Sequence, residues 1–220
     1  MSINQIILSE KDLGLGQIGG GARLNDIDLW PKDPITGHLM IPVLMMTSDF
    51  LSTSFIPSGM ALTVFVSVER EGSTYKRSSL RQLAVHQQSE LEKLVQRHSK
   101  VLLHALAPFE LVPEILEDPI PRSYIALQPL TDEQMMDELD DPDSGASISK
   151  VLGRPGWLQD PLYEPARYYF LAQILDADIA KVSSRHEGLF GGGIGYVFAD
   201  NRVKKMKEGD DAGYFFIQFT

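Results

Sequence analysis

The stretch "RYYFLAQILDADI", residues 167–179, has a counterpart earlier in the chain, "HLMIPVLMMTSDF", residues 38–50. Both stretches are apolar runs followed by an aspartate, and they lie 129 residues apart. Other pairs of segments keep the same order at offsets of 133 and 134 residues, with shared glycines, Val-Phe pairs and aspartates. Self-similarity at a nearly constant spacing indicates an internal repeat.

We therefore expect a fold of the α+β class that is dominated by β-structure. Residues 1–220 are predicted to form a single domain. The domain is expected to contain two related antiparallel β-rich halves, approximately 17–68 and 151–220, with an intervening helix and an acidic insert at approximately 78–143.

Short runs of β-branched, aromatic and other apolar residues, bounded by turn residues, predict the individual strands. Pro42 lies inside one of these runs, and because it lacks a backbone N–H we expect an edge strand or a bulge there. The predicted strands occupy residues 5–9, 39–46, 61–68, 101–106, 124–130, 166–175, 194–199 and 213–219.

Two segments predict helices. Residues 80–97 place most of their leucines on one face at a period of 3.6, so we expect one helix there with that face toward the core. Residues 131–142 predict one or two acidic helical turns, capped by Thr131 and ended by Pro142.

The segment "GLGQIGGG", residues 14–21, contains Gly14-x-Gly16-x-x-Gly19, the pattern of a dinucleotide-binding loop. Such a loop opens a helix whose N-terminus holds the pyrophosphate. No apolar stripe follows here, and Pro31 and Pro34 disfavour a helix. We interpret the glycines as a tight turn between strands, with "VLGRPG" as its counterpart in the second half.

The composition is that of a folded protein, with 43% hydrophobic and 23% charged residues in 220. No apolar run of about 18 residues occurs, so we expect no membrane span. The first residues lack the basic region of a secretory signal. Cysteine is absent, which excludes disulfides and thiolate metal sites and suits the reducing cytoplasm, where we expect the protein.

The net charge of −10 is concentrated in one segment. Residues 109–143 hold eleven acidic residues and a single basic one, Arg122, so they account for the whole net charge. An acidic lobe repels nucleic acid and attracts basic proteins; alternatively, it is a solvated loop that keeps the protein soluble. The candidate partner-binding residues are Asp132, Glu133, Asp137, Glu138, Asp140, Asp141 and Asp143.

The sequence offers little that points to catalysis. The five histidines form no HExxH motif or other close ligand pair, and neither a G-x-S-x-G elbow nor a P-loop occurs. Asp176 and Asp178 follow a predicted strand, and such a pair either binds a divalent cation or shapes a turn. We favour the turn because no third ligand is evident, and we expect no catalytic residue, cofactor or metal.

Two other features bear on binding. Trp30 and Trp157 lie near the start of each half, where they either face a groove or fill the core; we favour the core. The basic residues between Lys76 and Lys100 are not interleaved with aromatic residues and the chain is acidic in total, so we expect no direct binding of nucleic acid.

Several motifs resemble those of the YwqG-like proteins, a family of unknown function. The similar segments are "IGGGARLNDIDLWPKDPITGHL", "LGRPGWLQD", "YYFLAQILDAD" and "FGGGIGYVFADN", within residues 17–68 and 151–220. Two positions depart from the family pattern, which puts in doubt any polar pocket that they build: Leu44 stands where the family often has Gln, and a glycine replaces an aspartate in the second glycine cluster. The resemblance implies a duplicated β-rich fold without established catalytic residues, and some members resemble immunity proteins encoded beside bacterial toxins.

These observations lead to an expected function in binding rather than catalysis. We expect an immunity-type inhibitor that binds and occludes a cognate bacterial toxin, a basic protein that acts on nucleic acid. Met135, Met136 and Leu139 lie within the acidic segment as candidate apolar anchors, or they hold that segment onto the domain. A generic interaction or scaffold protein is the alternative, and an enzyme of unrecognised type is the third possibility. The oligomeric state is left open.

Overall fold

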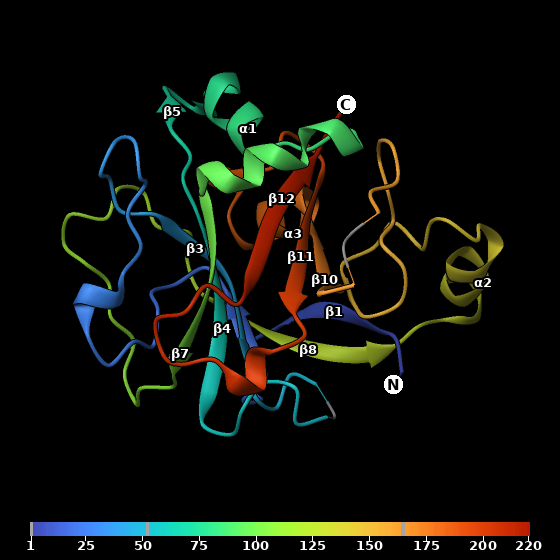
Figure 1. Ribbon diagram of the computed structural model, residues 1–220, viewed down its shortest axis with the longest axis horizontal. Helices are drawn as coiled ribbons and strands as arrows, with labels where there is room; N and C mark the ends of the chain where they lie inside the picture. The colour runs from blue at the N-terminus through green and yellow to red at the C-terminus, as the bar shows by residue number, and fades with distance from the viewer. Residues whose placement is uncertain (1, 52, 164–165) are drawn as a thin grey trace.

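The structure, a computed structural model, describes residues 2–51, 53–163 and 166–220. Its main feature is a ten-stranded antiparallel sheet in the order β12-β11-β10-β9-β1-β8-β2-β3-β4-β7 (Figure 1). The strands are β1 Asn4–Ser9, β2 Gly16–Ile18, β3 Ile41–Thr47, β4 Met60–Val66, β7 Ser99–Ala105, β8 Ser123–Pro129, β9 Lys150–Val151, β10 Tyr168–Leu175, β11 Ile194–Asp200 and β12 Gly213–Gln218. A separate hairpin pairs β5 Arg70–Glu71 with β6 Thr74–Tyr75. The predicted β-dominated α+β class is confirmed.

The sheet curls until its two outer strands meet. Leu102 of β7 forms a bridge with Asp211, just before β12. The Ser99 hydroxyl donates to the carbonyl oxygen of Phe215 at 2.6 Å. The main hydrophobic core is therefore enclosed by β-structure, and β3 and β4 are buried along nearly their whole length.

A second, smaller core lies on the other face of β10–β12. Its aromatic side chains include Tyr196, Phe198 and Phe216, stacked with ring centroids 5.3 to 5.8 Å apart. Trp157 packs on this stack, while Trp30 is buried in the main core and donates its indole N–H to the Met40 carbonyl at 2.9 Å. The tryptophans therefore serve in packing, as predicted.

The proline in β3 marks a bulge. The register between β3 and β4 shifts between Pro42 and Leu44. Strand β2 pairs only with Leu44–Met46, so Pro42 lies beyond the end of that ladder and beside the bulge, where a strand tolerates a residue without a backbone N–H. The β10–β11 register shifts in the same way between Phe170 and Ala172.

The prediction of one helix over residues 80–97 is wrong. The segment forms α1, Arg77–Leu83, and a 3₁₀ helix, η2, Gln88–Gln96, separated by extended residues. Val85 in this break donates its backbone N–H to Ile217 of β12 at 3.1 Å and is fully buried. The break follows from tertiary structure, since α1 packs its leucines into the main core and η2 packs its leucines onto the second.

The remaining helices are short. The acidic segment forms α2, Asp132–Asp140, and Thr131 caps it through a capping box with Gln134, so the predicted cap is confirmed. Helix α3 covers Asp176–Val182. The other 3₁₀ turns are η1 Ile27–Leu29, η3 Ser184–His186 and η4 Val203–Lys205.

A buried carboxylate holds the loop that precedes β3. Asp33 accepts hydrogen bonds from the Thr36 backbone N–H at 2.8 Å and from His98 Nδ1 at 2.8 Å, and His98 is the residue before β7. Burial by itself raises the pKa of Asp33, but the hydrogen bonds from Thr36, His98 and Ser67 outweigh it and hold the pKa well below its usual range.

We predict that Asp33 makes the stability of the fold depend on pH. Because its pKa is depressed in the folded protein, the ionised carboxylate stabilises the fold above its unfolded pKa of about 3.9, and this contribution is lost as the pH falls further. Asp33→Asn should lower the free energy of unfolding by about 1–3 kcal/mol at neutral pH. The difference from wild type should shrink below about pH 4.

Urea denaturation at several pH values checks this prediction, with Asp28→Asn as the control because Asp28 is exposed in the same region. An unfolding free-energy difference between wild type and Asp33→Asn that is the same at pH values above and below the usual aspartate pKa would contradict it.

Candidate functional site

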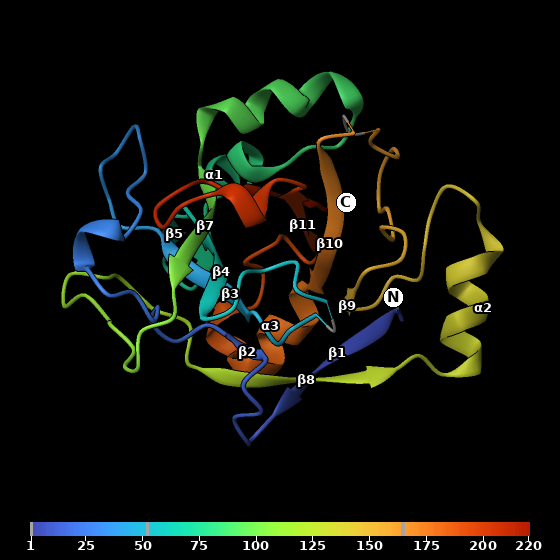
Figure 2. The same cartoon turned by 60° about the horizontal axis from the view of Figure 1, so that its bottom comes forward.

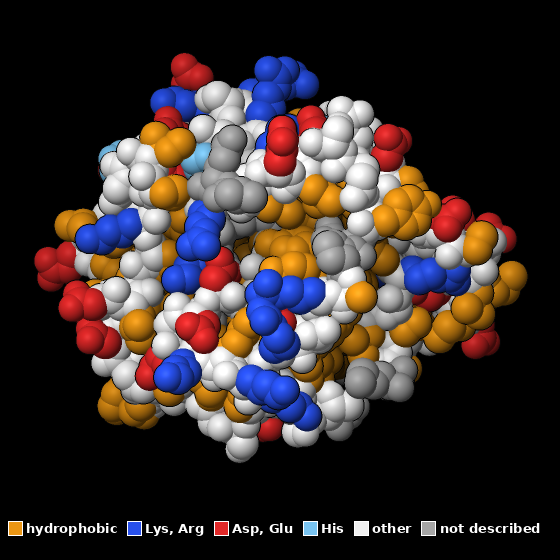
Figure 3. Space-filling view, viewed as in Figure 1, with side chains coloured by type: hydrophobic (Ala, Val, Ile, Leu, Met, Phe, Trp, Pro, Cys, Tyr) orange, Lys and Arg blue, Asp and Glu red, His pale blue; other side chains and the backbone are white. Residues whose placement is uncertain are grey.

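The acidic segment divides into two surfaces at opposite ends of the molecule. Strand β8 runs across the domain, with residues 106–122 at one end and α2 beyond the other, and both views agree on this (Figures 1 and 2). Figure 3 shows acidic side chains at both ends of the face in view and Lys and Arg side chains across its centre. The expectation of one acidic lobe is therefore wrong, because a central strand lies inside the segment.

The acidic residues at the 106–122 end are partly neutralised within the chain. Asp118 forms ion pairs with Arg70 at 3.0 Å and with Arg185 at 2.5 Å. Glu110 forms one with Arg122 at 3.3 Å. This end therefore presents less uncompensated charge than its sequence indicates.

The α2 end keeps most of its charge. Six of the seven predicted partner-binding residues are exposed, and within the described residues none of the six forms an ion pair. They are Asp132, Glu133, Asp137, Asp140, Asp141 and Asp143. We call these residues, together with Met136 and Leu139, the α2 surface.

Two large apolar side chains lie exposed among these acids. Met136 is 72% exposed and Leu139 is 65% exposed. Their spacing of three residues places them on the same side of the helix. Asp132 lies one turn before Met136 and Asp140 one turn after it, so the apolar pair is bracketed by negative charge. This combination matches the usual anatomy of a binding surface, with an apolar centre and a polar rim.

Glu138 differs from the other six acids because it is buried, with 1% of its surface exposed. Its carboxylate accepts hydrogen bonds from Lys150 Nζ, from the Ala146 backbone N–H at 2.8 Å and from the Arg154 backbone N–H at 2.6 Å. Burial lowers the pKa of Lys150, and the neighbouring Glu138 opposes that shift. Glu138 therefore anchors α2 to β9 and lies outside the α2 surface.

The Glu138 carboxylate fits into its site because two of the neighbouring residues are glycines. A Cβ atom added at Gly145 or at Gly153 would collide with the Glu138 carboxylate. The Arg154 guanidinium donates to the Asp141 carbonyl at 2.5 Å and to the Glu138 carbonyl, which closes the C-terminal end of α2. The sequence contained one indication of the Glu138–Lys150 ion pair, since Lys150 is the only basic residue between Arg122 and Arg154.

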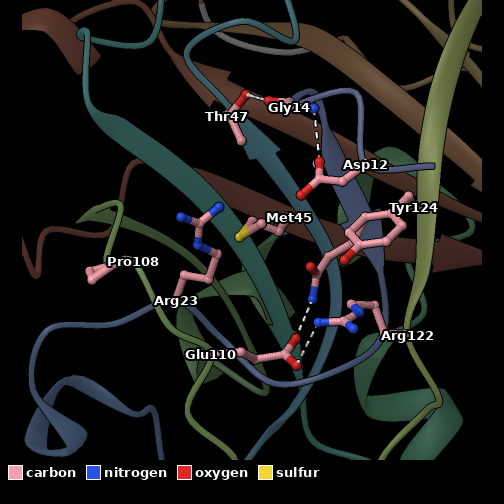
Figure 4. A pocket seen from close by; sticks show the side chains of 11 residues that line it. Asp12, Gly14, Arg23, Met45, Thr47, Pro108, Glu110, Arg122 and Tyr124 are labelled. Atoms are coloured by element: carbon pink, nitrogen blue, oxygen red, sulfur yellow. Dashed lines mark hydrogen bonds and ion pairs between the residues drawn. The ribbon is translucent and has the colours of Figure 1, made fainter.

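A second candidate site is a polar cavity of about 210 Å³ beside the first glycine run. It opens between β2, β3 and β8 and is lined by charged groups and backbone, with Asp12 and Arg23 among them (Figure 4). Its other lining residues are Gly14, Gly16, Gln17, Met45, Thr47, Pro108, Glu110, Arg122 and Tyr124. The sequence singled out only its glycine run, as a turn, and no pattern pointed to the cavity as a whole, because its residues come from five separate segments.

The first glycine run forms a turn and a short strand. Gly16 opens β2, and Gly19 and Gly20 have φ angles of +63° and +76°. A Cβ at Gly16 would collide with the Met45 carbonyl oxygen, so the close approach of β3 requires glycine there. The first helical turn after the run is η1, which begins at Ile27, so the helix that a dinucleotide loop opens is missing from this part of the chain.

The other polar candidates are held in structural roles. Asp176 accepts hydrogen bonds from the backbone N–H groups of Gly188 at 2.8 Å and Phe190 at 2.6 Å. Asp178 instead accepts from the Ser149 hydroxyl at 2.5 Å, so the two carboxylates serve different partners. Within the described ranges, no group of three or more His, Cys, Asp or Glu side chains is placed to hold a metal ion.

None of the helices within residues 2–51, 53–163 and 166–220 has the length and apolar character that spanning a bilayer requires. Searches for related proteins found no family model that matches the chain and no significantly similar curated protein.

Proposed function

We propose that this chain is a cytoplasmic immunity-type inhibitor that binds a basic, nucleic-acid-acting toxin through the α2 surface. The observation that carries the proposal is the exposed pair Met136 and Leu139. They are set among six exposed acids, four on α2 and two directly after it, and the helix is anchored by a buried ion pair. The toxin's phosphate-binding surface would meet these acids, which occupy the place of the nucleic acid's phosphates. The resemblance to YwqG-like proteins supports the same proposal.

Charge and apolar contact have different tasks in this mechanism. Exposed acids steer a basic partner into encounter and act mainly on the association rate. Apolar anchors that become buried in the contact act mainly on dissociation, because a few central side chains carry most of the binding energy. An anchored helix loses little conformational freedom on binding, which favours affinity.

A scaffold function is the alternative, and one observation favours it. The connection between β7 and β8 exposes the apolar side chains of Phe109, Val112 and Ile115, and it lies at the end of the molecule opposite α2. Exposed apolar side chains at both ends suit a protein that joins two partners. An inhibitor needs them at only one end.

We also infer that β2-β3-β4-β7 and β9-β10-β11-β12 are two copies of one unit. Each set runs in this order from the middle of the sheet to its edge, and in each the register shifts within the second strand. The turns after β2 and β9 have similar φ angles. Gly19 and Gly20 have values of +63° and +76°, and Leu152 and Gly153 have values of +63° and +81°. When the β10–β11 ladder is aligned with the β3–β4 ladder, Gln173 corresponds to Met45. The sequence comparison alone aligns Gln173 with Leu44.

We predict that the charges of α2 control the rate of partner capture. In the triple variant Asp137→Asn, Asp140→Asn, Asp141→Asn, association with the partner should slow about tenfold at low ionic strength. The effect should diminish as salt is added, because the Debye length falls from about 30 Å at 0.01 M to about 8 Å at 0.15 M. Glu138 is left unchanged because it is buried.

The partner is recovered by affinity purification from cells that produce the protein, and association is followed by stopped-flow at several salt concentrations. The matched control is Asp28→Asn, Glu114→Gln, Glu117→Gln, which removes three exposed charges at the other end. Equal association rates for wild type and the α2 variant at low salt would contradict the proposal that these charges steer the partner.

We predict that the anchor of α2 is costly to break. Glu138→Ala leaves Lys150 buried without a counter-charge and should lower the free energy of unfolding by about 3–5 kcal/mol. The double variant Glu138→Leu, Lys150→Met should lose much less, because a buried ion pair is often replaceable by apolar side chains.

Urea denaturation of both variants measures these losses, and hydrogen exchange of the α2 amides shows whether the helix loosens. If Glu138→Ala costs less than about 1 kcal/mol and leaves the exchange of α2 unchanged, the helix is held by other contacts.

A further inference from the structure

The polar cavity beside β2 is separate from the α2 surface, so its role is independent of the proposed function. Its volume of about 210 Å³ lies below the roughly 300–1,000 Å³ of pockets for drug-sized ligands. Any guest must therefore be a small molecule. Because the lining is largely polar, the guest must also offer polar groups.

Arg23 supplies a cation with its terminal nitrogens available. Its Nε donates to the Ala107 carbonyl oxygen at 2.6 Å, which fixes the side chain. The two terminal nitrogens make no hydrogen bond or ion pair within the part of the chain that the structure describes. Such a guanidinium fork matches the two oxygens of a carboxylate.

Asp12 supplies the opposite charge from another side of the same opening, as Figure 4 shows. One of its carboxylate oxygens accepts from the Gly14 backbone N–H at 2.8 Å. The second has no partner among the residues described, so it is available to an ammonium group.

The other two charged side chains of the lining form an ion pair with each other. Glu110 accepts from Gln17 Nε2 at 2.6 Å with one oxygen and from Arg122 Nη1 at 3.3 Å with the other. The Arg122 guanidinium also lies 5.0 Å from the centre of the Tyr124 ring. The four charged groups therefore sum to zero, which favours a guest without net charge over a simple ion.

From this arrangement we propose that the cavity binds a small zwitterion of the amino-acid class. The guest's carboxylate pairs with the Arg23 guanidinium, and its ammonium group lies toward Asp12. Met45 and Tyr124 contact its short carbon chain. Thr47 donates its hydroxyl to the Gly14 carbonyl oxygen at 2.5 Å and thereby fixes the glycine loop to β3 beside the guest.

Isothermal titration calorimetry with single compounds tests the proposal. The probes are the common L-amino acids, β-alanine and γ-aminobutyrate, with acetate and methylammonium as compounds that carry only one of the two charges. At least one zwitterion should bind with a dissociation constant of millimolar or below, and at least tenfold more tightly than either single-charge compound.

Arg23→Gln and Asp12→Asn should each weaken that binding at least tenfold, whereas the exposed remote variants Arg77→Gln and Asp28→Asn should leave it unchanged. Circular dichroism establishes that each variant is folded. If Arg23→Gln does not fold, Arg23→Lys serves instead, since it keeps the charge but loses the fork. The proposal is overturned if no zwitterion binds saturably, if acetate binds as tightly, or if the folded Arg23 variant binds like wild type.

Discussion

The antiparallel ladder between β1 and β8 is the interaction on which the rest of the structure depends. It joins six residue pairs, from Asn4 with Pro129 to Ser9 with Tyr124. Strand β9 attaches to β1 and β2 attaches to β8, so the two sides of the sheet meet in the middle only through this pair. The two strands are separated by residues 10–122, so the ladder is a non-local contact whose formation costs the entropy of closing a long loop. The direction of β8 also separates the acidic residues that precede it from those that come after it.

Much of the β-structure was predictable because eight strands of the large sheet carry their own signal, whereas the short strands β2 and β9 lie in segments that the sequence indicated as turns. The aromatic runs that form β10, β11 and β12 are apolar and bounded by glycine turns. Thr131 predicts the start of α2 because it is a typical N-cap residue. The break between α1 and η2 was not predictable from periodicity, because residue Val85 leaves the helix to pair with β12. A stripe of leucines does not reveal that it serves two cores rather than one.

The candidate site was predictable only in part, for a similar reason. The charge pattern located the acids, but burial of Glu138 depends on an ion pair with Lys150, which lies in β9, twelve residues further along the chain. The same contact changes the physical picture of α2. An acidic stretch without it would be a solvated and mobile segment, whereas one buried carboxylate holds the helix in place and leaves Met136 and Leu139 on its outer side. The polar cavity needs five chain segments to meet, and local sequence contains no sign of that.

The proposed function depends above all on a basic partner docking on α2 rather than on the other acidic end. Photo-crosslinking in producing cells distinguishes the two ends, with benzoylphenylalanine placed at Met136 in one variant and at Ile115 in the other. Both positions are highly exposed, at 72% and 77%, so the comparison is matched in accessibility. We expect the probe at position 136 to capture one predominant basic protein, with a yield that mild salt reduces. Capture of that protein from position 115 but not from position 136 would contradict docking on α2.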